Sequence, residues 1–237
     1  LLEAGRSVVV LGDPGMGKTT LLLFLSLLCA GAAELPGYGG PARVPLFISL
    51  RELAHERSKD PNDERLRLID FLARRAETDL ELPRAHWAFF DALLRLGQAV
   101  VLLDGLDEVA NGAARSRIAQ DIRVFQAEYP RCPVWVTSRI FGYTPDVALP
   151  DQRFEHVRVG QLEDDQVDDF LGRWYQIQIP DNRREREEHQ ASLRAAIFRD
   201  RGVRRLAGNP LLLTLMAFIH RVLGNLPQDR ARLYDRC

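Results

Sequence analysis

The order of three patterns between Ser7 and Leu28 constrains the fold more than any other feature of the sequence. Residues 7–11 form a short apolar, mostly β-branched run, which is typical of a buried strand. Residues 12–19, Gly-Asp-Pro-Gly-Met-Gly-Lys-Thr, match G-x-x-x-x-G-K-[ST] at every fixed position. A leucine-rich run without a helix breaker follows. Because strand, glycine loop and helix come in this order, the segment predicts a phosphate-binding loop.

This loop has the residue types that the chemistry of phosphate binding requires. Backbone N–H groups must converge on a triphosphate, and glycine permits that close approach. We expect Lys18 to contact the β- and γ-phosphates and the Thr19 hydroxyl to ligate Mg²⁺. Among 32 basic residues only Lys18 and Lys59 are lysine, and a compact ammonium suits a cradled phosphate better than a guanidinium. The predicted nucleotide-binding residues here are Gly12, Asp13, Pro14, Gly15, Met16, Gly17, Lys18, Thr19 and Thr20.

A cluster of acidic residues follows the apolar run Ala99–Leu103 and is the second functional pattern in the sequence. Asp104 ends this predicted strand, and Asp107 and Glu108 come three and four residues later. We expect Asp104 to hold Mg²⁺ together with Thr19. Either Asp107 or Glu108 would be the catalytic acid, acting beside Lys18. An acid displaced from the metal aspartate by a turn positions water less well, so the spacing predicts a slow, switch-like enzyme.

Composition limits the partners and the compartment. The chain has 237 residues, is 46% hydrophobic and carries a net charge of −1, so it has no bulk attraction to nucleic acid or to anionic membranes. Its three cysteines, Cys29, Cys132 and Cys237, are scattered, which favours a reducing, cytoplasmic compartment. The histidines and cysteines lack the spacing of a zinc site. We expect no segment to span a membrane.

The hydrophobic pattern changes near Gly160. Before it, strands alternate with helical stretches, which predicts an α/β three-layer domain with a mostly parallel five-stranded sheet over residues 1–160. After it the pattern is helical only, which predicts a small all-α domain over residues 161–237. The chain begins without methionine and stops inside a helical pattern, so we interpret it as part of a longer protein.

The individual elements follow from the same periodicity. The further strands are predicted at residues 44–50, 99–103, 134–136 and 154–159. Helices are predicted at residues 63–76, 83–96, 190–206, 210–222 and 228–237. Another follows the acidic residues 104–108 and ends near residue 128, and a further one begins at residue 163. The charge run Arg183–Gln190 is interpreted as a solvated helix face or a loop.

Several segments together resemble the NACHT family of signal-transduction ATPases, within the group called STAND. The matching segments are GDPGMGKTT (12–20), VPLFISLREL (44–53), LLDGLDE (102–108), TSR (137–139), GNPLLL (208–213) and LPQDRARLY (226–234). A small residue after the metal aspartate and an acid three places on are distinctive for that family. Ile140 departs from it, because many members carry proline after TSR.

The resemblance implies a molecular switch that binds ATP and ADP with Mg²⁺ and hydrolyses ATP slowly. It implies that Arg139 is the sensor arginine for the γ-phosphate and that Pro210 packs on adenine. The longer protein would open and self-oligomerise when ATP-bound, with a winged-helix module and effector and sensor modules outside this chain. A role in innate immune or anti-phage defence would follow. The heavy use of Arg, Ala and Leu is typical of a GC-rich bacterium.

Three alternatives remain to be weighed against this function: a housekeeping P-loop enzyme (GTPase, transporter ATPase or small-molecule kinase), a ring-forming AAA+ ATPase, and a nucleotide-binding scaffold. A GTPase should contain N-K-x-D, and a transporter ATPase should contain an L-S-G-G-Q-like signature; the sequence has neither. An AAA+-like ATPase is disfavoured by Gly105, which stands where an adjacent acid is expected. A scaffold that binds nucleotide without meaningful hydrolysis stays open, because Asp107 and Glu108 can be present and still be badly placed. The nucleotide that copurifies with the chain would separate these functions.

Overall fold

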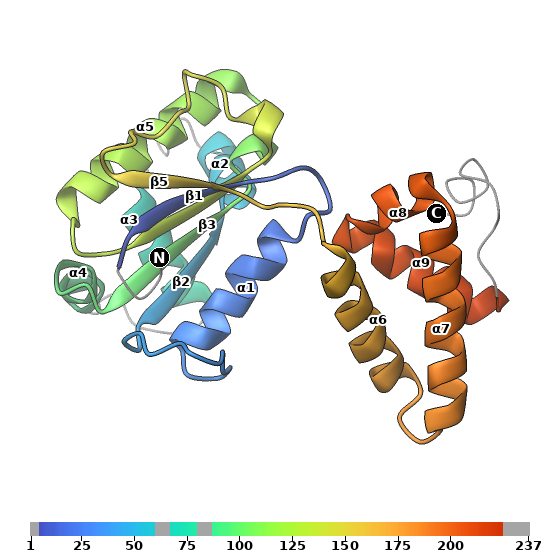
Figure 1. The fold of residues 1–237 in the computed structure, drawn as a ribbon. Helices are drawn as coiled ribbons and strands as arrows, with labels where there is room; N and C mark the ends of the chain where they lie inside the picture. Colours follow the sequence, from blue (N-terminus) through green and yellow to red (C-terminus); the bar gives the residue numbers. More distant parts are fainter. Residues whose placement is uncertain (1–4, 60–66, 80–86, 225–237) are drawn as a thin grey trace. The chain divides into compact units, whose positions relative to one another are not determined.

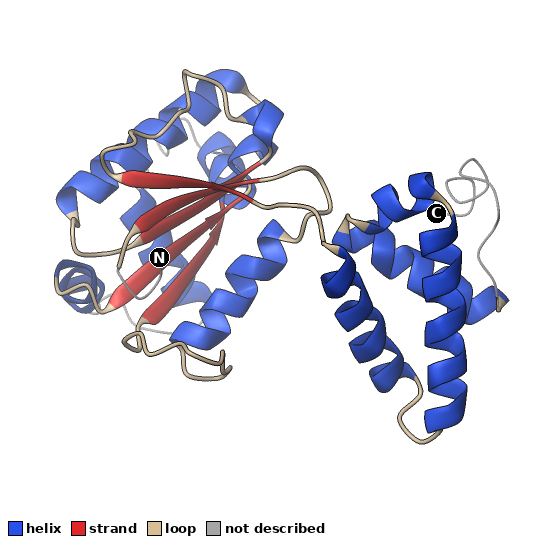
Figure 2. Cartoon of the chain, viewed as in Figure 1, coloured by secondary structure: helices blue, strands red, loops and turns tan. Residues whose placement is uncertain are grey.

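The computed structural model describes residues 5–59, 67–79 and 87–224. The chain folds into two compact units. The first unit comprises Leu1–Asp13 with Lys18–Val159, and the second comprises Pro14–Gly17 with Gly160–Cys237. Figures 1 and 2 show a layered α/β fold in the first unit and helices in the second.

A five-stranded sheet forms the centre of the first unit. Its strands are β1 (Ser7–Leu11), β2 (Val44–Ser49), β3 (Ala99–Asp104), β4 (Val134–Ser138) and β5 (Phe154–Arg158). The strand order is β2-β3-β4-β1-β5, and every paired neighbour is parallel. Pro45 lies in β2, at an edge of the sheet, where a missing backbone donor is tolerated. The predicted fold class is therefore confirmed.

Side-chain alternation along the strands divides the core of this unit into two layers. Val9 and Leu11 belong to a cluster with residues of α2 to α5, whereas Val8 and Val10 belong to a cluster with residues of α1. Because both faces of the sheet are covered, the central strands β1, β3 and β4 are buried along nearly their whole length and are mostly apolar rather than alternating. The helices are α1 (Lys18–Cys29), α2 (Leu50–Lys59), α3 (Leu68–Asp79), α4 (Trp87–Arg95) and α5 (Gly112–Glu128).

The second unit has its own helical core. Its helices are α6 (Asp164–Gln178), α7 (Arg183–Arg199), α8 (Arg201–Ala207) and α9 (Pro210–Leu223). The core contains Val167, Leu171 and Tyr175 from α6, together with apolar residues of the other three helices. Two helix starts are well capped: Glu163 and Gln166 form a capping box before α6, and the Asn182 side chain accepts from the Glu185 N–H before α7.

Some predicted helix limits were wrong. The charge run Arg183–Gln190 is the first half of α7, where Arg183 and Arg184 pair with the glutamates four residues on. The predicted helix 190–206 is interrupted at Asp200, whose side chain caps α8. The predicted helix 228–237 and the first residues of the predicted helices 63–76 and 83–96 lie outside the described residues.

The described helices are short for a bilayer. No single one of them has both the length and the apolar character needed to cross a membrane. The bent pair α8 and α9 meets the requirement jointly, by length and composition only.

Candidate functional site

Parallel pairing brings the chemically important strand ends to one edge of the sheet. The register pairs Leu11 with Ser138 and Ser49 with Asp104. β4 lies between β1 and β3, so the segment after β4 lies between the glycine loop and the acidic turn. Crevices at the carboxyl ends of strands are the usual ligand sites of open α/β sheets.

Asp104 is held by hydroxyl groups from two neighbouring elements. The Thr19 hydroxyl, in the first turn of α1, donates to Asp104 Oδ2 at 2.8 Å. The Thr137 hydroxyl, in β4, donates to Asp104 Oδ1 at 2.6 Å and accepts from the Gly105 backbone N–H at 2.8 Å. Sequence reasoning missed Thr137, although it is the first residue of the TSR segment and directly precedes Ser138 and Arg139.

The Lys18 ammonium is held by the start of its own loop. It donates to the carbonyl oxygens of Gly12 at 2.9 Å and Asp13 at 3.1 Å. Burial lowers the pKa of Lys18; the charges of Asp107 and Asp104 oppose this shift, and the charge of Arg139 adds to it. The predicted lysine, acids and arginine therefore gather within electrostatic reach of one another.

The turn after Asp104 separates the two candidate catalytic acids. Gly105 has φ 77°, a left-handed conformation that glycine adopts without strain, and it opens the short 3₁₀ helix η3 (Leu106–Glu108). Leu106 is fully buried in the sheet-side core. Of the two acids that follow, Asp107 is part-buried and Glu108 is exposed.

Asp107 binds Arg139 through both carboxylate oxygens. Oδ1 accepts the Arg139 backbone N–H at 2.8 Å, and Oδ2 forms an ion pair with Arg139 Nε at 3.0 Å. The Asp107 side chain is only 10% exposed, whereas that of Arg139 is 51% exposed. Arg139 immediately precedes a second 3₁₀ helix, η4 (Ile140–Gly142). The acidic turn and the arginine loop are thus linked directly.

Arg115 strengthens this link from α5. Its guanidinium donates to the carbonyl oxygens of Asp107 at 3.2 Å and Val109 at 2.9 Å, and to that of Gly142 at 3.5 Å. Sequence reasoning missed Arg115 because its acceptors are backbone groups, which no residue pattern reveals.

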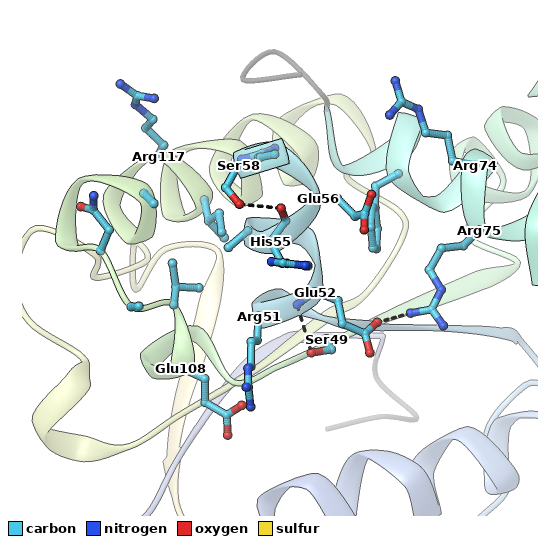
Figure 3. Close-up of a pocket in the computed structure, with 18 of the residues that line it drawn as sticks. Ser49, Arg51, Glu52, His55, Glu56, Ser58, Arg74, Arg75, Glu108 and Arg117 are labelled. Atoms are coloured by element: carbon cyan, nitrogen blue, oxygen red, sulfur yellow. Dashed lines mark hydrogen bonds and ion pairs between the residues drawn. The ribbon is translucent and has the colours of Figure 1, made fainter. Parts of the chain in front are cut away.

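Glu108 has different surroundings from Asp107. It is exposed and lines a hollow of about 1220 Å³ bounded by residues of α2, α3 and α5. Figure 3 shows Glu108 and Arg51 among the residues that line the hollow, together with the Arg75–Glu52 ion pair. None of residues 12–20 lines the described part of this hollow. Glu108 is therefore accessible to solvent, whereas both carboxylate oxygens of Asp107 bind Arg139.

The loop residues Pro14–Gly17 belong to the second unit, where they contact the start of α9. Asn209 Nδ2 donates to the Pro14 carbonyl at 2.9 Å, and the Leu211 N–H donates to the Gly15 carbonyl at 3.2 Å. A side chain at Gly15 would collide with Asn209 and Leu211, which explains the glycine there. Asn209 also caps α9, and Pro210 occupies its first turn.

The donor groups present fit a magnesium ion rather than a caged metal. Among the described residues, no group of three or more His, Cys, Asp or Glu side chains could hold a metal. The Thr19 hydroxyl and the Asp104 carboxylate lie 2.8 Å apart. Mg²⁺ typically takes one or two such oxygen ligands from protein and completes its shell with water and substrate phosphates.

Comparisons with known proteins identify the family. None of the curated proteins matches the chain. A STAND protein with a tetratricopeptide-repeat sensor from Pyrococcus horikoshii is 16% identical, with a TM-score of 0.47, over 99% of this chain and 30% of that chain. A variant of RuvB from Thermotoga maritima is 13% identical, with a TM-score of 0.46, over 97% of this chain and 60% of that one. The family profile of the NACHT domain matches residues 6–177. The chain therefore belongs to the NACHT family of P-loop NTPases.

Proposed function

We propose that this chain is the nucleotide-operated switch of a longer signalling protein, binding ATP and ADP and hydrolysing ATP slowly. The observation that carries the proposal is the 2.8 Å contact between Thr19 and Asp104, with the Lys18 ammonium held by the adjoining loop. These are the groups that a P-loop protein places around a nucleotide phosphate and its metal ion.

Each group has a distinct task in this proposal. The backbone of residues 12–20 encloses the phosphates, and Lys18 exchanges its contacts with Gly12 and Asp13 for phosphate oxygens. Thr19 and Asp104 hold Mg²⁺, which neutralises charge on those oxygens when it is bound. Arg139 donates to the γ-phosphate, Glu108 orients and deprotonates the attacking water, and Pro210 packs on the adenine.

The biological setting follows from the family and extends the proposal. ADP would keep the full-length protein closed, and ATP would permit opening and self-oligomerisation. The sensor and effector modules would lie outside residues 1–237. The compartment would be the cytoplasm and the role innate immune or anti-phage defence.

The identity of the bound nucleotide tests this function directly. The folded chain should copurify with ADP or ATP, and calorimetry on the emptied chain should give Mg²⁺-dependent binding of ATP. GDP should bind at least tenfold more weakly than ADP. Copurified GDP, or no binding of either adenine nucleotide, would refute the proposal. Binding without any hydrolysis in single-turnover assays would favour the scaffold alternative.

A further inference from the structure

The two adjacent acids after Gly105 differ in how freely their carboxylates can reach water. The acid nearer to Asp104 in sequence is the less accessible one. Asp107 is the acid nearer to Asp104 in sequence, yet its side chain is nearly buried and both of its oxygens contact Arg139. Glu108 is exposed, and its carboxylate makes no hydrogen bond or ion pair with any residue that the structure describes. A group that takes a proton from water must present a free oxygen to that water.

The backbone around Asp107 is fixed as firmly as its side chain. A Cβ on Gly142 would come within 2.3 Å of the Asp107 Cβ, so η4 packs directly on this residue. Arg115 holds the Asp107 carbonyl and the Gly142 carbonyl with one guanidinium. Asp107 therefore has little freedom to turn toward a water molecule, but it offers a stable support for the neighbouring arginine.

The contact with Arg139 has the geometry of a support. Asp107 takes the backbone N–H and the inner nitrogen Nε of Arg139. The two terminal guanidinium nitrogens, on the outer end of the side chain, are the ones suited to donate to a phosphate. About half of this arginine side chain is exposed, compared with a tenth of that of Asp107.

We propose that Asp107 is the positioning residue of Arg139, holding the guanidinium for the γ-phosphate, and that it is not the acid that activates water. This inference rests on the proposed function, because it needs a γ-phosphate to be read. It divides the roles of the two acids: Asp107 determines the discrimination of ATP from ADP, and Glu108 is left for water.

Calorimetric titrations with Mg²⁺ and a non-hydrolysable ATP analogue, and separately with ADP, test the division. The variants are Asp107→Ala, the isosteric Asp107→Asn, Arg139→Ala and the Asp107→Ala/Arg139→Ala double variant. Glu155→Gln is the matched control, since it also removes a carboxylate that pairs with an arginine at 3.0 Å. Arg139→Ala should weaken analogue binding about ten- to 150-fold, the range for one hydrogen bond to a charged group.

Asp107→Ala should lose analogue affinity in that same range, with ADP affinity within about twofold of the parent. The double variant should be no weaker than Arg139→Ala alone, because the effects of residues acting as one unit do not add. Asp107→Asn, which keeps an acceptor but loses the ion pair, should show the loss even if the alanine variant fails to fold.

Parental analogue affinity in both Asp107 variants, or fully additive losses in the double variant, would overturn the inference and leave the proposed function standing. A parent chain that binds neither nucleotide would overturn both. Equal losses for the analogue and for ADP would assign Asp107 to the β-phosphate region or to the fold, and the positioning role would be wrong.

Discussion

Thr137 connects to Asp104 through a 2.6 Å hydrogen bond and to the next backbone amide through another of 2.8 Å. One buried hydroxyl thereby sets the orientation of the carboxylate and fixes the beginning of the turn after β3. The strand β4, which ends one residue before Arg139, also supports the proposed metal ligand, so the two parts of the site cannot be positioned independently.

Thr137→Val should test this role of the hydroxyl. Valine keeps the shape but leaves the Gly105 N–H without its acceptor, which costs about 1–3 kcal/mol of the free energy of unfolding. The Mg²⁺-dependent part of ATP-analogue affinity should fall as well. Urea unfolding and calorimetry measure the two effects. Thr137→Ser, which retains the hydroxyl, should keep the Mg²⁺ dependence; if it does not, the methyl group rather than the hydrogen bond matters.

Lys18→Arg should abolish nucleotide binding nearly as completely as Lys18→Ala. The guanidinium is planar and larger than the ammonium, which here fits between the carbonyl oxygens of Gly12 and Asp13. Titration with a fluorescent ADP analogue measures the loss. Lys59→Arg, which changes a lysine that pairs with Glu56, is the matched control and should bind normally. Near-parental affinity in Lys18→Arg would contradict the cradled-ammonium interpretation.

Asp104→Asn should weaken nucleotide binding only in the presence of Mg²⁺. The amide keeps the contacts with Thr19 and Thr137 in outline but lacks the charge that a divalent cation requires. Comparing ATP-analogue affinity with and without Mg²⁺ isolates the Mg²⁺-dependent contribution of Asp104 to binding. An equal loss under both conditions would mean that Asp104 acts on the fold and not on the metal.

Glu108→Gln should leave the affinity for the ATP analogue unchanged and slow hydrolysis by about 10²- to 10⁴-fold, the usual contribution of a general base. Single-turnover assays with excess protein separate the chemical step from product release. Hydrolysis at the parental rate would refute the assignment of Glu108. A parental turnover of tens per second would contradict the slow switch itself.

The helical unit should lose stability in mild acid because of His220. This side chain is fully buried, where it hydrogen-bonds Tyr175 at 2.7 Å and Ser192 at 3.1 Å. Burial, and secondarily the nearby His189, lower the pKa of His220 from 6.5. A lowered folded-state pKa means that the unfolded chain binds the proton more readily. Stability is therefore complete above about pH 6.5 and declines as the pH falls below it.

Urea unfolding of the parent at pH 7.5 and pH 5.5 should show this decline. In His220→Gln the difference between the two pH values should shrink. His55→Gln, which alters an exposed histidine of α2, should keep the parental difference. His189 faces the same ring at 5.7 Å and approaches Glu185 to 3.9 Å. An unchanged difference in His220→Gln would exclude His220 as the source.

The sequence predicted the parts of the structure that regular patterns encode. The three central strands β1, β3 and β4 follow from mostly apolar runs that are buried on both faces, and the fold class was confirmed. The closeness of Thr19 and Asp104 was expected because both were predicted to ligate the same Mg²⁺ ion. For residues 183–190 the sequence left a solvated helix face and a loop both open, because eight polar residues have no apolar face. The Arg–Glu pairs four residues apart support the helix that the structure has there.

The fine structure of the site could not be predicted for a different reason. Arg115 binds backbone carbonyls, and every residue has one, so no residue type marks its partners. Asp107 and Glu108 are neighbours of similar chemistry, and the left-handed Gly105, the buried Leu106 and the contact of Arg115 with the Asp107 carbonyl accompany the turn of Asp107 toward Arg139. Spacing along the chain can place both acids at the sheet edge but cannot distinguish their directions.

The position of β4 between β1 and β3 also determines what can move when one phosphate is gained or lost. Strands held in register by hydrogen bonds on both sides do not slide. The sheet therefore keeps the distance between the segments that carry Lys18 and Asp104 constant. Adjustment to a diphosphate or a triphosphate is then left to the short turns beyond the strands, η3 and η4, which one aspartate and two arginines bind together. Exchange of the nucleotide would displace a few residues of η3 and η4 and would leave the core of the sheet unchanged.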